Sequence, residues 1–82
     1  MLTEETYRLF LQEAILAIKE RALEARQERP SKEADSSGYL FQSGRLLAFN
    51  EVISILQQYA DGFQIGLDEL HLQDIEPDRD LV

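Results

Sequence analysis

The stretch YLFQSGRLLAFNEVISILQQYADGF, residues 39–63, decides the fold of this chain. Apolar residues recur in it every three or four positions, which is the period of an α-helix, so we predict a helix over about 39–63. These apolar positions span close to half of the helical circumference: Phe41, Leu46, Ala48, Phe49, Val52, Ile53, Ile55, Leu56, Tyr59, Ala60 and Phe63. One facing helix covers only part of so wide an arc, so more helices are needed than one chain supplies.

The segment before it predicts a second long helix, over about residues 3–28. This segment lacks Gly and Pro and is rich in strong helix formers. Thr3 is suited to cap its start, and Pro30 is expected to end it. Lys19 falls among polar residues on the side expected to face solvent. The opposite, apolar face is expected to form the core of the pair, and it holds Tyr7, Phe10, Leu11, Ala14, Ile15, Ala17, Ile18, Ala22 and Ala25.

Residues 29–38, RPSKEADSSG, form a polar connection of the length that joins two antiparallel helices lying side by side. We therefore predict an all-α, antiparallel two-helix hairpin. Ser36 or Ser37 is expected to cap the second helix by accepting a backbone N–H. That role explains the serines without nucleophilic chemistry.

The last segment, QIGLDELHLQDIEPDRDLV, residues 64–82, has too many apolar residues for a free tail. We predict a short helical turn around Leu70, followed by an extended acidic strap that folds back over the hairpin. The expected buried residues are Leu67, Leu70, Leu72, Ile75 and Leu81. Residues 1–82 then form a single helical domain.

Self-association is the leading expectation for how this small chain is stabilised. A core of this size rarely gives more than roughly 3–5 kcal/mol of net stability, and the chain has no cysteines. Leu9, Leu16 and Leu23 repeat every seven residues opposite the predicted core face, which suggests a second contact seam, although isolated exposed leucines are also common. Gly44 within a helix suggests a close helix crossing. The predicted interface of a homodimeric four-helix bundle, or of a tetramer, comprises Leu9, Leu16, Leu23, Phe41, Gly44, Phe49, Val52 and Leu56.

The charge distribution argues against nucleic acid and membrane as partners. The net charge is -8, and residues 61–82 alone carry seven acids against one base. No basic stripe is visible that would contact phosphates, and no apolar run approaches the roughly 18 residues of a spanning helix. The acidic N-terminal stretch is unlike a signal peptide, so a cytoplasmic location is expected.

A few residues invite a chemical role. Arg45 points toward the apolar arc and is expected to form an ion pair with a carboxylate of the tail, of the first helix or of a neighbouring subunit. The alternating acids of D-I-E-P-D-R-D resemble a calcium loop, but Arg79 occupies the position that needs Gly. His71 has no nucleophile near it in sequence, so a structural role is expected. We predict no catalytic, cofactor or metal residues. A candidate partner surface, alternatively a solvated face, comprises Glu51, Gln58, Asp74, Glu76, Asp78 and Asp80.

The second half of the chain resembles a group of short bacterial helical proteins of unknown function. In that group a Gly-x-x-x-Ala-aromatic-x-Glu-Val helix leads to a Leu-rich turn and an acidic C-terminus that contains Pro. The matching residues are Gly44, Ala48, Phe49, Glu51, Val52, Leu67, Leu70, Pro77, Asp80 and Leu81. The resemblance implies a small all-helical bacterial protein and brings no activity with it.

Two functional hypotheses follow from the sequence. The first is a non-enzymatic, homo-oligomeric protein that acts as an interaction or regulatory module. The alternative is an inhibitory or neutralising protein, such as an antitoxin, an immunity protein or a nucleic-acid mimic, whose acidic C-terminal segment faces a basic partner. A carboxylate-based enzyme or metal protein of the helical-bundle type needs Glu-x-x-His spacing, which is absent.

Overall fold

The computed structural model describes residues 3–82, and within this range the regular structure is entirely helical. Two long helices, α1 (Glu4–Glu28) and α2 (Ser37–Gly62), pack together. The shorter elements are the 3-10 turns η1 (Arg29–Ser31) and η2 (Leu67–Leu70) and the single turn α3 (Pro77–Asp80). The all-α prediction is confirmed. None of the helices in residues 3–82 is long and apolar enough to cross a membrane.

The two long helices begin at the capping residues that the sequence suggests. The Thr3 hydroxyl accepts the N–H of Thr6 at 3.2 Å, and the Ser36 hydroxyl accepts the N–H of Tyr39 at 3.1 Å. Because Ser36 is the cap, α2 starts at Ser37, two residues before the predicted start. α1 ends at Glu28, as predicted. Pro30 follows in the 3-10 turn η1, which it can join because the early positions of a helical turn need no N–H donor.

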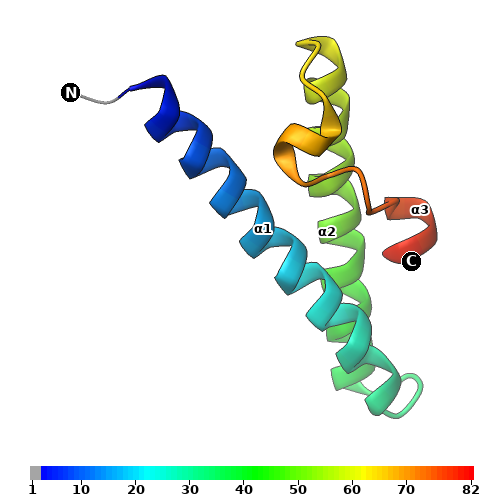
Figure 1. The fold of residues 1–82 in the computed structure, drawn as a ribbon. Helices are drawn as coiled ribbons and strands as arrows, with labels where there is room; N and C mark the ends of the chain where they lie inside the picture. Colours follow the sequence, from blue (N-terminus) through cyan, green and yellow to red (C-terminus); the bar gives the residue numbers. More distant parts are fainter. Residues whose placement is uncertain (1–2) are drawn as a thin grey trace.

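The long helices form a wedge. In Figure 1 they lie closest together near their connection, and they diverge toward the start of α1 and the end of α2. The turn η2 lies between the diverging ends and contacts both helices, and α3 packs against α2. The C-terminal segment therefore fills space that the two helices leave between them.

The core is shared by all parts of the chain. It comprises Ile15, Ala22 and Ala25 of α1, Leu46 and Ile53 of α2, and Leu72, Ile75 and Leu81 of the C-terminal segment. The predicted fold-back is confirmed: these last three residues are buried, and Leu67 and Leu70 are partly buried against the core. The segment differs from the predicted extended strap in one respect. Pro77 begins the helical turn α3, a position that suits the fixed φ of proline. We call residues 67–82 the strap.

The predicted core face of the first helix is correct only in part. Ala22 and Ala25 are buried, but Tyr7, Phe10 and Leu11 are 57%, 69% and 44% exposed. The physical reason is the divergence of the helices, which moves the first turns of α1 away from α2 (Figure 1). An apolar surface is therefore left uncovered.

Candidate functional site

The strap contacts polar residues of both long helices, and we call the space that it fills, between Gln12 and Lys19 of α1 and Asn50 and Gln57 of α2, the groove. On α1 these polar residues are seven positions apart. Gln12 Nε2 donates to the Glu69 carbonyl at 2.8 Å, and Lys19 Nζ donates to the His71 carbonyl at 2.5 Å. Lys19 also forms an ion pair of 2.5 Å with Asp74. Lys19 is only 8% exposed, so its predicted place on a solvent-facing side was wrong. The strap covers it.

The α2 wall of the groove has the same design. Gln57 Nε2 donates to the carbonyls of Leu72 at 3.1 Å and Ile75 at 2.8 Å. Seven residues earlier, Asn50 Nδ2 donates to the Pro77 carbonyl at 2.9 Å. In the helical pattern of residues 39–63, Asn50 and Gln57 fall opposite the apolar arc, where exposure to solvent is expected. That placement was wrong, because both side chains turn toward the strap. Side chains from both helices thus satisfy the carbonyl groups that a buried irregular segment leaves without secondary-structure partners.

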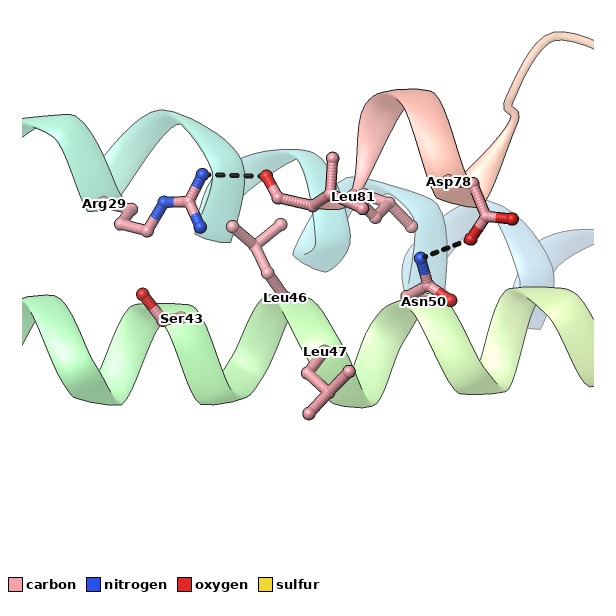
Figure 2. Close-up of a pocket in the computed structure, with 8 residues that line it drawn as sticks. Arg29, Ser43, Leu46, Leu47, Asn50, Asp78 and Leu81 are labelled. Atoms are coloured by element: carbon pink, nitrogen blue, oxygen red, sulfur yellow. Dashed lines mark hydrogen bonds between the residues drawn. The ribbon is translucent and has the colours of Figure 1, made fainter.

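The end of the strap and α2 line a pocket of about 390 Å³ that is partly open to solvent. Arg29, in η1, donates to the Val82 carbonyl at 2.8 Å, and Asn50 Nδ2 donates to the Asp78 carboxylate at 3.4 Å. Figure 2 shows Asn50 facing Asp78. Leu46 and Leu81 form the apolar wall between these two polar contacts. The pocket thus lies under the last turn of the strap.

The residues predicted as a partner surface are divided by the fold. Glu51 and Gln58 lie exposed on α2, whereas the other four, Asp74, Glu76, Asp78 and Asp80, belong to the strap, and of these only Asp80 is half-buried. Hydrogen bonding to Lys19 holds the pKa of Asp74 below its usual value. Asp80 is 15% exposed and bonds Arg79 through both carboxylate oxygens; this bonding to Arg79 lowers its pKa, as does the backbone N–H of Glu76. Within the chain, Glu76 pairs with Arg79 at 3.6 Å.

These pKa shifts predict that the protein loses stability in acid. A carboxyl whose folded pKa lies below its unfolded pKa stabilises the fold above the unfolded value, and this contribution is lost as the pH falls through the folded value. The melting temperature should therefore fall as the pH is lowered from about 5 to about 2. Asp74→Asn should flatten this dependence and lower the melting temperature at pH 7. The matched change Asp68→Asn, at an exposed residue of η2, should do neither. Equal acid profiles of wild type and Asp74→Asn would contradict the assignment.

The predicted interface residues divide into exposed and half-buried groups. Leu9, Leu23, Phe41 and Val52 are exposed, between 37% and 64%, whereas Leu16 is half-buried. Phe49 and Leu56 are also half-buried and pack against the core of the same chain. The remaining exposed large apolar side chains of the two long helices, together with Phe63 just after α2, are Tyr7, Phe10, Leu11, Leu40, Leu47, Ile55, Tyr59 and Phe63.

Two expectations about α2 are changed by the structure. Arg45 donates to the Gln42 side chain at 3.0 Å and lies over the Phe49 ring, 5.8 Å from its centre. Among residues 3–82, no carboxylate forms an ion pair with Arg45, so the predicted ion pair with the tail or with the first helix was wrong. A Cβ at Gly44 would meet no atom within 4 Å, so no close helix crossing lies there in a single chain. Contacts of Arg45 and Gly44 with a neighbouring subunit remain predictions.

The polar residues that hold the strap were not recognised from the sequence. The signal that was present is their common seven-residue spacing, Gln12 to Lys19 on α1 and Asn50 to Gln57 on α2. Such spacing keeps residues on one side of a helix. Amide or cationic side chains that recur every seven residues beside the apolar face of a helix indicate that another segment of the chain covers that part of the helix.

Comparison with family models, with curated proteins and with solved structures found no significant match to this chain. In residues 3–82 no three His, Asp or Glu side chains gather closely enough to hold a metal ion. The features of the molecule that bear on its function are therefore the groove with its strap and the uncovered apolar surface.

Proposed function

We propose that this protein is a non-enzymatic antiparallel helical hairpin of the cytoplasm that pairs with a second copy of itself and acts as a protein interaction or regulatory module. The uncovered apolar surface of the wedge is the observation that carries the proposal. Monomeric soluble proteins rarely leave large contiguous apolar patches exposed.

The helical positions of the exposed apolar residues support a single contact surface. At about 100° per residue, Val52 and Tyr59 lie about 100–120° round α2 from the buried Ile53, whereas Gln57 lies about 40° round in the opposite sense. On α1, Tyr7 and Phe10 lie about 80–140° from Ile15 and Lys19 about 40° in the opposite sense. When two antiparallel helices face each other, residues displaced in the same rotational sense from the contact lie on the same side of the pair. The strap therefore occupies one side of the hairpin, and the other side presents the open face, which we define as Tyr7, Phe10, Leu11, Phe41, Val52, Tyr59 and Phe63.

The surface area of the chain supports a second copy as the occupant of the open face. A compact monomer of 9.5 kDa is expected to expose about 5,000 Å², and this chain exposes 6010 Å². The excess is close to the roughly 800 Å² that each partner buries in a standard protein interface. The radius of gyration, 14.7 Å, also exceeds the roughly 12 Å expected for a compact domain of this length. Both values suit one half of a four-helix bundle.

Association is tested by sedimentation of the full chain. At a concentration of tens of micromolar the protein should have twice the mass of one chain. Val52→Glu should shift it to the monomer, because a carboxylate would then be buried in an apolar contact. Gln27→Glu adds the same charge at an exposed residue of α1, about 120° round the helix from Ile15 in the sense of Lys19, and should leave the dimer intact. A wild-type monomer with full helicity at that concentration would refute the proposal.

A second contact surface on α1 would allow two dimers to form a tetramer. Leu9 and Leu23 are exposed on α1, on the strap side of the helix, and Leu16 lies between them. If they join two dimers, Leu9→Glu should lower the mass from four chains to two. A wild-type mass of two chains would limit the assembly to the dimer, and a tetramer unchanged by Leu9→Glu would place its seam elsewhere.

The alternative function, neutralisation of a basic partner by the acidic segment, has weaker support. The charge of residues 61–82 favours it. The contacts of the acids do not, because Asp74 pairs with Lys19 and Asp80 pairs with Arg79 and lies 3.9 Å from Arg26. Carboxylates already paired within the chain are poor candidates for contacts with another protein.

A further inference from the structure

The contacts in the groove resemble those by which a protein binds a peptide. Four side chains of α1 and α2, together with Arg29 just beyond α1, donate to the carbonyl oxygens of six strap residues: Glu69, His71, Leu72, Ile75, Pro77 and Val82. Main-chain hydrogen bonds of this kind give affinity for a segment, and pockets for individual side chains give specificity. Here the buried Leu72, Ile75 and Leu81 occupy the pockets.

We propose that the groove between α1 and α2 is a peptide-binding site, occupied in one chain by its own strap, and that the strap of a second copy binds there in exchange. The ligand is an acidic segment with apolar residues at the spacing of Leu72, Ile75, Pro77 and Leu81. The site lies on the side of the hairpin away from the open face, so this proposal is independent of the dimer proposed above.

The groove contains a buried cation and apolar side chains that need the strap to cover them. Lys19 is 8% exposed, and its acceptors, the His71 carbonyl and the Asp74 carboxylate, both come from the strap. If the strap left an otherwise intact groove, a recessed cation would lose both partners, and Leu46 and Ile53 would lose their cover. The strap of a second copy would restore both acceptors of Lys19 and would cover Leu46 and Ile53 again.

A second copy is the occupant that the structure favours, because it carries the identical segment and so reproduces every contact. The covalent connection from α2 to the strap is residues 63–66, all of which are exposed, and its first three N–H groups donate to carbonyls of α2. Exchange of an identical element between chains changes only such a connecting segment, which makes it a low-cost route to association. We call residues 63–66 the hinge.

Within one chain the tethered strap competes strongly with any added segment. A short linker gives a tethered segment an effective concentration in the millimolar range. Exchange between intact chains is therefore expected only where the chain concentration approaches that range, and a free copy of the strap at micromolar concentration should fail to enter the groove of an intact chain. It should enter once the tethered strap has lost its own anchors.

The test uses a fluorescent synthetic peptide of residues 67–82 and the full-length chain. In the receiving chain, Leu72→Asp and Leu81→Asp disable its own strap and leave α1 and α2 unchanged. The peptide should bind this chain saturably and the wild-type chain at least tenfold more weakly, in fluorescence anisotropy. Equal binding to both chains, or no binding to the disabled chain while it keeps its helicity, would overturn the proposal.

A matched pair of glutamines tests the site itself. Added to the receiving chain, Gln57→Leu removes the donor to two strap carbonyls and should weaken the peptide about tenfold. Gln58→Leu is the same change at the exposed neighbour and should leave the affinity within about twofold. Val52→Glu should also leave peptide binding unchanged, even where it breaks the dimer. Equal losses for Gln57→Leu and Gln58→Leu would place the peptide elsewhere.

A second measurement applies if the disabled chain does not fold. A protease site is placed in the hinge of the otherwise natural full chain, which is cleaved after folding. The released strap should co-elute with the helices on size exclusion and should be replaced by an isotopically labelled strap peptide added in excess. Separation of the two pieces on cleavage would overturn the proposal.

Discussion

Leu72→Ala should lower the free energy of unfolding by about 2–5 kcal/mol, the usual range for truncating a buried leucine. Leu72 is 0% exposed and packs in the same cluster as Ile53 and Ile15, so the strap is as much a part of the core as the helices are. The loss combines the apolar surface no longer buried with the cavity left behind. Chemical denaturation of both proteins measures the difference.

Leu40→Ala is the matched control for Leu72→Ala. Leu40 is 59% exposed near the start of α2, so the same truncation removes little buried surface there. Its effect on a single chain should stay within about 0.5 kcal/mol. If the two variants lose equal stability, the strap does not pack on the helices as described.

The helices were predictable because their signals are local. Thr3 and Ser36 cap the two long helices as expected, and α1 ends at Glu28 as predicted. The burial of Leu72, Ile75 and Leu81 was also predictable, since five apolar residues in a short acidic segment need cover. These conclusions depend on residue type and spacing within one segment.

The choice of covering segment was not predictable in the same way. An apolar arc shows which residues avoid water, but it does not show whether the other helix, the strap or another chain covers them. Tyr7, Phe10 and Leu11 have the same helical period as Ile15, yet they lie where α1 has moved away from α2. The direction of the helix axes decides this, and it depends on the strap that fills the wedge.

The polar side of each helix was misread for a related reason. Lys19, Asn50 and Gln57 are typical surface residues, and a helical wheel alone places them in solvent. In the structure they lie beside the core and bind strap carbonyls, because an irregular segment brings unpaired carbonyl groups that amide and ammonium donors satisfy. A helical wheel contains no information about such a segment.

Deletion of residues 73–82 should have the largest effect of all, and it separates the strap's two possible roles. The deletion removes Ile75, Pro77 and Leu81 from the core, together with Asp74, the carboxylate partner of Lys19. If the segment is chiefly structural, the remaining chain should lose its cooperative thermal transition and bind a dye for exposed apolar surface. This loss should differ little between low and high salt, because apolar burial is not screened.

If the segment is chiefly an electrostatic surface for a basic partner, the opposite behaviour is expected. The shortened chain would keep its helicity and its melting temperature, and the full chain would release its partner as salt rises. The contacts favour the structural role, because Ile75 and Leu81 are buried at 6% and 1% exposure while Asp74 and Asp80 are paired within the chain. Circular dichroism melting at two salt concentrations decides between them. A shortened chain that melts like the full one would show that the helices stand alone and would shift the argument to the neutralising function.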